Sequence, residues 1–508
     1  MKHIYSFFFL LLPAAIAVKA QTPQQKISQY RLAHENEIIS EYIDFLSIPN
    51  VSSDSANILM NAGFIMHMML QRGINASLLQ GSSAGVTPAV FGEIKTPGAT
   101  KTIAYYAHYD GQPVNPRQWW TGLDPFKPVF ITAPLEQGGS IIKYKKGDAL
   151  DANWRLSGRG SADDKAGVMA ILNAYDALKK SNIKLTQNIK FFFEGEEEIG
   201  SVHLGEIFEQ HKDKLAADLW VIADGPRHVS GKKMVLFGVR GDINMDLTVY
   251  GPKRPLHSGN YGNWAPNPAM MLVQLLAGMK DSDGNVLVKG FYDDVIPLTE
   301  AEKQAIAKVP GIEETLKNEL GIARPDGAGK SFLELLLLPT LNINGIQSAN
   351  TGKLAANIIP VKAAATLDLR LVPGNDLERQ VQKVKNHITD RGYHIIDHEP
   401  TDAERMQYAK LIKITTGSGY NAQRTPMNLP AAQGVIKALQ STVDYPVIVL
   451  PSAGGSLPLF LFEKQLGARV ITVPLVNYDN NQHAENENVK LQFLWEGIET
   501  MAAIMMMK

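Results

Sequence analysis

The sequence of 508 residues contains no cysteine. This absence excludes a disulfide framework, a cysteine nucleophile and a lipid-anchored cysteine behind a signal peptide. Stability must therefore come from a hydrophobic core, for which a 45% share of hydrophobic residues is ample. The length predicts more than one domain.

An excess of charge of either sign is also missing. Lys+Arg 50 against Asp+Glu 51 gives a formal net charge of -1, which provides no electrostatic basis for binding nucleic acid or an anionic membrane. The sequence has no Gly-x-Ser-x-Gly elbow of a serine hydrolase and no glycine-rich loop ending in Lys-Ser/Thr that would cradle a phosphate. We find no internal repeats.

A long hydrophobic run occurs only at the N-terminus. Residues 1–20 combine an early lysine, an apolar stretch and small residues before Gln21, which predicts a secretory signal peptide cleaved after Ala20. The alternative, a membrane anchor, is disfavoured because Pro13 interrupts a short run. The longest later apolar stretch, 332–343, contains a glutamate and a proline. We therefore expect a mature protein that is soluble and is secreted or periplasmic.

Short apolar runs alternate with a helical pattern in the first half of the chain. The stretches 102–108, 188–193 and 219–223 are typical of strands covered on both faces. Residues 164–180 place their apolar side chains on one helix face. This alternation predicts a parallel α/β sheet, preceded by helical structure over 21–80.

The pattern changes near residue 240. Strand, helix, two strands, helix and strand are predicted in the order of a ferredoxin-like α+β unit, over residues 242–250, 268–280, 339–347, 362–373, 375–392 and 393–399. A polar stretch from about 281 to 330 has the character of an insertion in this unit. Alternating α/β structure resumes after about residue 420, so we predict a small domain at 240–418 inserted between 21–239 and 419–508.

Polar side chains with catalytic potential follow the predicted buried strands. His108 and Asp110 end the strand 102–108 and point to the same face, at the edge where open parallel sheets bind ligands. Alone, the pair is more typical of an edge histidine hydrogen-bonded to its neighbour. The adjacent Asp163 and Asp164 begin the next helix, where capping explains Asp164 as readily as chemistry does.

The stretch FFFEGEEEIGS runs from a buried strand into four carboxylates. Glu197 and Glu198 are adjacent and tend to point in different directions, so that one can bind a metal while the other faces a substrate. We expect Glu194 and Glu196 to lie in a solvated acidic turn.

Two further candidates end later strands. Asp224 follows 219–223, although an aspartate before Gly-Pro is also a common turn former, and His483 lies in a polar loop behind another buried strand. Together these residues converge on one edge of the sheet, where carboxylates would repel one another unless neutralised. Divalent cations neutralise such clusters through carboxylate and imidazole ligands, so the pattern predicts a metal site.

Six motifs in fixed order carry a family resemblance: HYDGQPV, WWTGLDPF, GRGSADDKAG, EGEEEIGS, LHSGNYGN and QHAENE. Together they resemble the co-catalytic di-zinc metallopeptidases related to aminoacylase, glutamate carboxypeptidase and succinyl-diaminopimelate desuccinylase, and most of all the carnosine and non-specific dipeptidase branch. The resemblance covers nearly the whole mature chain. It implies an α/β fold, with a mixed, mostly parallel catalytic sheet (phosphorylase/hydrolase-like) and an inserted α+β ferredoxin-like lid domain.

The resemblance also implies a set of metal ligands. His108 and Asp224 would bind one divalent metal ion, Glu198 and His483 the other, and Asp163 would bridge the two. The ions would be Zn, with Mn or Co possible.

Further roles follow from the same resemblance. Asp110 would orient His108, and Glu197 would act as general base, taking a proton from a water activated by two cations and returning it to the leaving amine. A strained cis peptide bond would join Asp163 to Asp164. His257 would stabilise the oxyanion, often from the partner subunit of a homodimer formed through the lid.

Substrate contacts are implied for Arg370 and Asn357 in the lid and for Gly455 and Ser456 in the turn SAGGS. Many dipeptidase relatives carry an arginine, often followed by an acid, before this turn, whereas this chain has Ser452 and Ala453.

The sequence as a whole predicts a secreted zinc peptidase that cleaves dipeptides or short peptides. The alternative within enzymes is an amidohydrolase that removes N-acyl groups from amino acids with the same metal site. A binding protein that has lost turnover is disfavoured, because every implied metal ligand and Glu197 are present.

Overall fold

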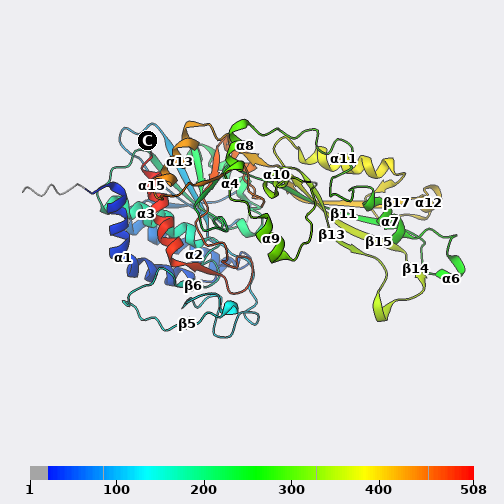
Figure 1. Cartoon of the computed structure of the whole chain (residues 1–508), viewed down its shortest axis with the longest axis horizontal. Helices are drawn as coiled ribbons and strands as arrows, with labels where there is room; N and C mark the ends of the chain where they lie inside the picture. The colour runs from blue at the N-terminus through cyan, green and yellow to red at the C-terminus, as the bar shows by residue number, and fades with distance from the viewer. Residues whose placement is uncertain (1–20, 84, 328, 456, 508) are drawn as a thin grey trace, which may run out of the picture.

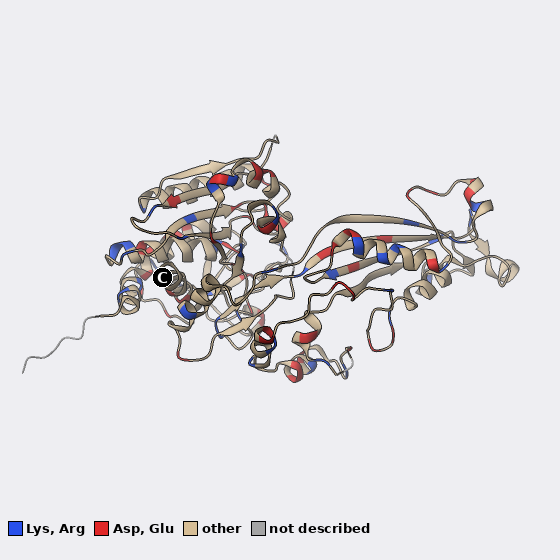
Figure 2. Ribbon diagram, turned by 90° about the horizontal axis from the view of Figure 1, so that it is seen from above, with Lys and Arg blue, Asp and Glu red and all other residues tan. Residues whose placement is uncertain are grey.

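The computed structural model describes residues 21–83, 85–327, 329–455 and 457–507, so the predicted signal peptide lies outside the described residues. The molecule consists of a large α/β part and an elongated arm (Figure 1). Acidic and basic residues are interspersed over both parts (Figure 2). Within the described ranges, no helix combines the length and the apolar character needed to cross a bilayer.

An eight-stranded mixed sheet forms the centre of the large part. Its four middle strands, β7, β3, β8 and β20, run parallel, which confirms the predicted α/β class. In spatial order the strands are β1 (Ala76–Leu79), β2 (Ala89–Ile94), β7 (Asn188–Glu194), β3 (Thr102–His108), β8 (Leu219–Ile222), β20 (Val470–Thr472), β9 (Met234–Leu236) and β19 (Ile448–Leu450).

Helices cover both faces of this sheet, and its strands are accordingly largely apolar. Phe191 and Phe193 pack into the larger core, whereas Phe192 packs into the core of the opposite face. The larger core is closed by α1 (Pro23–Leu46), α2 (Ser55–Gln71), α3 (Lys165–Lys180), α13 (Pro430–Gln440) and α15 (Leu491–Met505), and the smaller by α4 (Leu204–Gln210), α5 (Lys212–Leu215) and α14 (Phe460–Leu466).

A small sheet beside the large one joins segments distant in sequence. Its strands are β21 (Asn488–Lys490), β6 (Arg155–Ser157), β4 (Val129–Ile131) and β5 (Ile141–Ile142). Pairing of β21 with β6 holds the loop that follows Ser157 against the loop that precedes Asn488. Both loops carry candidate metal ligands.

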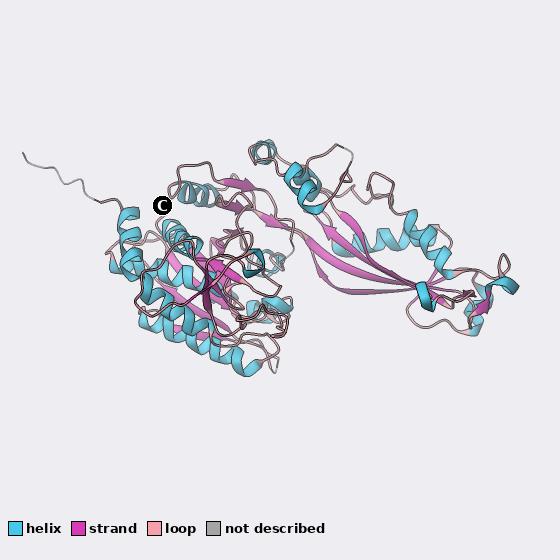
Figure 3. Ribbon diagram, turned by 60° about the horizontal axis from the view of Figure 1, so that its bottom comes forward, coloured by secondary structure: helices cyan, strands magenta, loops and turns pink. Residues whose placement is uncertain are grey.

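The arm is a five-stranded sheet with its helices α7 (Pro268–Ala277) and α11 (Leu377–Asp390) packed on one face (Figure 3). Its strands, in spatial order, are β13 (Thr340–Gln347), β15 (Lys362–Leu371), β11 (Gly241–Tyr250), β17 (Leu411–Tyr420) and β16 (His394–Ile396). The end of the arm carries a two-stranded ladder of β12 (Leu256–His257) and β14 (Ile358–Ile359), with α6 (Ser258–Tyr261).

Two predicted elements are wrong. The strand that completes the ferredoxin-like order beside β11 is β17, whereas the predicted strand at 393–399 is only the short edge strand β16. Residues 415–418 of β17 are polar and exposed, so that part of the strand lacks an apolar pattern. The stretch 21–80, predicted as helical, ends in the strand β1 because Ala76–Leu79 pairs with β2.

The insertion predicted at 281–330 contains helices. These are α8 (Glu300–Ala307) and α9 (Glu313–Leu320), followed by α10 (Phe332–Leu336). Helix α8 packs back onto β19 of the large sheet, and Glu302 of α8 forms a buried ion pair with Arg424 at 3.2 Å. The insertion, which branches from the arm, therefore packs against the large part of the molecule.

Candidate metal centre

Three acidic or imidazole side chains from separate segments meet at the carboxyl edge of the parallel strands. His108 is the last residue of β3, Asp224 lies two residues beyond β8, and Asp163 precedes α3. Each offers a ligand atom, and these atoms lie within 4.8 Å of one another. All three side chains are buried.

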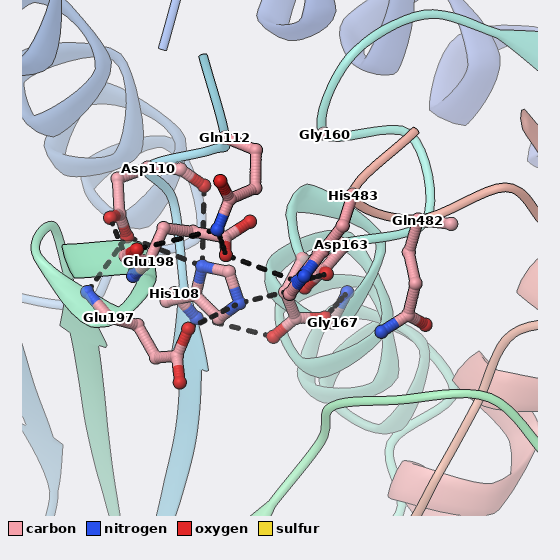
Figure 4. Close-up of polar contacts among 12 residues, drawn as sticks. His108, Asp110, Gln112, Gly160, Asp163, Gly167, Glu197, Glu198, Gln482 and His483 are labelled. Carbon is pink, nitrogen blue, oxygen red and sulfur yellow. Dashed lines mark hydrogen bonds and ion pairs between the residues drawn. The ribbon is translucent and has the colours of Figure 1, made fainter. Parts of the chain in front are cut away.

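A second group of three shares Asp163 with the first. It consists of Asp163, Glu198 and His483, again with ligand atoms within 4.8 Å of one another. His483 Nε2 lies 3.1 Å from Asp163 Oδ2 and 3.2 Å from Glu198 Oε2, whereas Asp163 Oδ1 faces His108 Nε2 at 2.9 Å (Figure 4). The two oxygens of one carboxylate thus face the two groups.

The electrostatics of this cluster match the needs of cations. Burial, reinforced by the nearby Asp163 carboxylate, raises the pKa of Asp224 to about 7. Burial works against ionisation of Asp163 as well, but hydrogen bonds with His108 and His483 hold its pKa below the usual range. Buried carboxylates and imidazoles are the donor set that divalent metals bind, so the residues fit the ions that the sequence predicts.

Asp110 organises the ligands without belonging to either group. One of its oxygens lies 3.3 Å from His108 Nδ1. The carboxylate also accepts hydrogen bonds from the backbone N–H groups of Glu197, at 3.2 Å, and Glu198, at 3.0 Å. A single buried side chain therefore fixes both the histidine ring and the acidic turn.

Glu197 lies beside the cluster and outside both groups of three. Its Oε2 is 3.8 Å from His108 Nε2. Burial raises the pKa of Glu197 well above its usual range, against the lowering effect of His108 and together with the repulsion from Asp224. A carboxyl group with a raised pKa is suited to accepting and returning a proton.

The segment that begins α3 has two of its expected features. A cis peptide bond joins Asp163 to Asp164. Asp164 is the N-cap of the helix, accepting a hydrogen bond from Gly167 N–H at 3.1 Å. It also accepts one from His108 N–H at 3.2 Å, so capping and support of the ligand strand come from the same side chain.

The expectation that Glu194 and Glu196 lie in a solvated turn is wrong, since both side chains are buried. Glu194 accepts a hydrogen bond from the Tyr106 hydroxyl at 2.7 Å, and burial raises its pKa to about 7. Glu196 contacts His203 Nδ1 at 2.9 Å and accepts one hydrogen bond from Thr87 N–H. Partners supplied by other segments replace the solvent, and sequence periodicity does not reveal such partners.

Glu487 is a residue of the site region that the sequence analysis missed. It is fully buried and pairs with the guanidinium of Arg159 at 2.7 Å. Its carboxylate also accepts hydrogen bonds from the backbone N–H groups of Gly160, Ala162 and Asp163. Glu487 thus ties the loop that carries His483 to the loop that carries Asp163. The motif QHAENE contained this glutamate, but only its burial distinguishes it from Glu485.

We expect Glu487→Gln to weaken both stability and metal binding. Breaking a buried ion pair leaves Arg159 uncompensated, which costs roughly 3 kcal/mol of unfolding free energy. Chemical denaturation measures this loss, and elemental analysis should show a reduced metal content. Glu485→Gln, two residues earlier in the same loop, is the matched control. Equal stability and metal content in the two variants would contradict the positioning role.

Gln112 is a second residue that the sequence analysis did not single out. Its side-chain amide donates a hydrogen bond to Glu198 Oε2 at 2.8 Å (Figure 4). Only the close approach of the two loops identifies it, since the residue occurs in a motif noted for its histidine and aspartate.

Two of the predicted catalytic and substrate residues lie at the tip of the arm. His257 is exposed and Asn357 accepts a hydrogen bond from Ser258 N–H at the tip of the arm, where α6 and β14 lie at the opposite end of the molecule from α3 (Figure 1). Arg370, on β15, forms ion pairs with Asp368 at 3.1 Å and Asp242 at 3.5 Å. The carbonyl of Gly455 accepts a hydrogen bond from Arg240 N–H, and Ser456 lies outside the described residues. His257 and Asn357 therefore lie far from the metal cluster of their own chain (Figure 1).

Comparison with known proteins now identifies the family. A family model described as "Peptidase family M20/M25/M40" matches residues 104–507, a span that contains both groups of candidate ligands. The chain belongs to this peptidase family. Its members are metallopeptidases, so the M20 peptidase described here is an enzyme that uses divalent metal.

The relatives of this M20 peptidase include dipeptidases. The Cys-Gly metallodipeptidase DUG1 of Candida albicans is 27% identical over 90% of this chain and 91% of its own. The Beta-Ala-His dipeptidase of Homo sapiens is 25% identical over 94% of this chain and 91% of its own. Among solved structures, the M20 family metallo-carboxypeptidase Sso-CP2 from Sulfolobus solfataricus superposes with a TM-score of 0.74 and 29% identity, covering 93% of this chain and 99% of that one. The M20 peptidase therefore matches these proteins over nearly their whole length.

Proposed function

We propose that this M20 peptidase is a secreted dipeptidase that holds two zinc ions and uses Glu197 as general base. The observation that carries the proposal is the pair of three-residue groups that share Asp163, with Glu197 beside them and outside both. Dipeptidase activity of relatives that align over nearly their whole length supports the substrate class.

The metal ligands divide between two sites in this proposal. His108, Asp163 and Asp224 hold one ion, and Asp163, Glu198 and His483 hold the other. Bound divalent cations supply Lewis acidity, which polarises a carbonyl group and makes water easier to deprotonate. Zinc suits the mixed imidazole and carboxylate donors, and Mn or Co could replace it.

The chain's own residues carry the proton. The raised pKa of Glu197 suits its carboxylate to take a proton from the attacking water and later to donate it to the leaving amine. Asp110 holds the Glu197 backbone and the His108 ring, so that the base keeps its position while the proton moves.

The alternative function is removal of an N-acyl group from an amino acid by the same centre. The sequence Ser452-Ala453 in the turn before Gly454 offers no cation to a substrate carboxylate, so strict selectivity for dipeptides is not built into this turn. The two functions share the metals and the base. They differ in the group on the acyl side of the scissile bond, which is an amino acid in a dipeptide and another acyl group in an N-acyl amino acid.

An assay of the purified mature chain distinguishes these functions. The protein is stripped with a chelator, shown to be inactive, and reloaded with zinc, manganese or cobalt. A panel of dipeptides and N-acyl amino acids is then offered. We expect about two equivalents of metal and higher kcat/KM on dipeptides. Reloaded protein that cleaves only the N-acyl amino acids would overturn the dipeptidase assignment.

Location outside the cytoplasm is part of the proposal. It is supported by the sequence of residues 1–20, which has the parts of a signal peptide. N-terminal sequencing of the exported protein should begin at Gln21, and retention of Met1 in a soluble cytoplasmic protein would contradict secretion.

We also propose that the enzyme is a homodimer in which His257 completes the site of the partner subunit. His257 is exposed at the tip of the arm, and its Nδ1 accepts a hydrogen bond from Gly259 N–H at 3.1 Å, which leaves Nε2 available to a substrate. Such a donor stabilises the oxyanion that develops on the substrate. The position of the arm tip, far from α3 in the same chain, favours action in the partner (Figure 1).

Subunit complementation tests this arrangement. His257→Ala and Glu197→Gln are each expected to be nearly inactive. When they are mixed and allowed to exchange subunits, mixed dimers contain one site with both Glu197 and His257 intact, so about a quarter of wild-type activity should return. Absence of recovery, in a mixture shown to exchange subunits, would place His257 in its own chain's site.

A further inference from the structure

A cavity of about 720 Å³ lies between the inserted helices and the large part of the molecule. We call it the insertion pocket. It is lined by half-buried apolar side chains of the insertion and by strand residues of the large sheet, among them Ile306, Val309, Ile312, Leu333, Leu336 and Leu450. Its size is that of pockets that bind small molecules.

The insertion pocket begins next to the metal cluster. Pro226 lines it, two residues after Asp224, and two residues of chain span at most about 7 Å. Gly454 also lines the insertion pocket. Leu457 follows three residues later and so lies within about 11 Å of Gly454. It lines a small cavity whose lining also includes Glu197 and Asp224. One residue of an extended peptide and its side chain cover such a distance. The separation between the cluster and the edge of the pocket is therefore one that a dipeptide can span.

The inserted helix α10 forms the wall next to the turn of Gly454. A Cβ atom on Gly454 would lie 3.2 Å from Leu336 Cδ2, which is closer than most side-chain contacts. The glycine thus allows the apolar helix to approach the turn. A leucine side chain of the inserted helix therefore lies beside the turn.

Charged groups also lie around the pocket. Arg227 is buried and its Nη1 is paired with Glu496, whereas its Nε and Nη2 have no hydrogen-bond partner among the described residues. Glu313 accepts a hydrogen bond from Phe332 N–H at 3.2 Å, and Lys303 is exposed. Apart from these charged residues, the lining side chains named above are apolar, which favours a hydrocarbon side chain in the pocket.

We propose that the insertion pocket binds a bulky apolar side chain of the peptide substrate, which makes the enzyme selective for dipeptides containing residues such as leucine or phenylalanine. This inference rests on the proposed peptidase function. Transferring a leucine or phenylalanine side chain from water into an apolar pocket improves affinity by about ten- to a hundred-fold over a small residue.

Binding is measured first, so that the result does not depend on turnover. Metal-loaded Glu197→Gln protein is titrated by calorimetry with two series, Ala-X and X-Ala, where X is glycine, alanine, leucine or phenylalanine. We expect at least ten-fold lower Kd for leucine or phenylalanine than for alanine in one series. Equal Kd values across both series would overturn the inference.

A variant that fills the pocket localises the effect. Ala307 lines the insertion pocket at an exposed position of α8, so Ala307→Trp should fold and should weaken binding of the phenylalanine peptide at least ten-fold without changing that of Ala-Gly. The control is Ala301→Trp, exposed on the same helix and outside the pocket. An equal effect of the two variants, or none from Ala307→Trp, would overturn the inference.

Turnover by the wild-type enzyme separates this inference from the proposed function. Selective binding without hydrolysis of any dipeptide would refute the peptidase assignment and leave the pocket's ligand class supported. Hydrolysis with no dependence on side-chain size would refute the pocket and support the peptidase assignment.

Discussion

Glu197→Gln is expected to reduce kcat by about 10²- to 10⁴-fold, the usual contribution of a general base, with unchanged metal content. Glutamine has the shape of glutamate but cannot accept a proton at neutral pH. The side chain of Glu197 belongs to neither group of ligands, and its backbone hydrogen bond to Asp110 does not involve the carboxylate. The substitution therefore removes the proton acceptor alone.

Steady-state kinetics on a cleaved dipeptide and elemental analysis of the same preparation check this result together. Glu209→Gln, an exposed position on α4, is the control for the loss of one negative charge. Normal turnover by Glu197→Gln would refute the mechanism. A variant that is inactive because it has lost metal would instead make Glu197 a ligand.

Asp163→Asn is expected to lose metal from both sites and all measurable hydrolysis. Its two carboxylate oxygens face His108 and His483 separately, so an amide, which keeps one oxygen and no charge, cannot serve both groups. We expect less than one equivalent of bound metal after dialysis, compared with about two in the wild-type enzyme. Circular dichroism should show an intact fold, because the N-cap of α3 is the neighbouring residue.

Asp164→Asn is the matched comparison for this variant. It makes the same chemical change one residue later, at the N-cap of α3, where replacement of a cap costs about 1 kcal/mol at most for a residue that can still accept a hydrogen bond. We expect nearly full metal content. Full metal content in Asp163→Asn would refute the bridging position of that carboxylate.

The parallel strands of the large sheet were predictable because strands buried on both faces are largely apolar. The runs 102–108, 188–193 and 219–223 became β3, β7 and β8, side by side and parallel. Since their carboxyl ends share one edge, the polar residues after them had to meet. The convergence of His108, Asp224 and the acidic turn follows from that topology alone.

The arm was less predictable where its strands are half exposed. The polar end of β17 gives no alternating apolar pattern, so the sequence predicts the closing strand at 393–399, where only the short edge strand β16 forms. The burial of Glu194 and Glu196 was missed for a related reason. A carboxylate next to a turn is expected to face solvent. In this structure the Tyr106 hydroxyl and the Thr87 N–H, both from other segments, donate hydrogen bonds to these carboxylates in place of water.

The fold class, the order of the motifs and the candidate ligands and base follow from the amino-acid sequence, because they depend on local patterns and on the common direction of parallel strands. The pairing of Glu487 with Arg159, the position of Asp163 between two groups of ligands, and the apolar pocket formed by the insertion became evident from the folded chain. These features depend on contacts between segments up to several hundred residues apart. Such contacts are set by packing of whole elements, which no short stretch of sequence encodes.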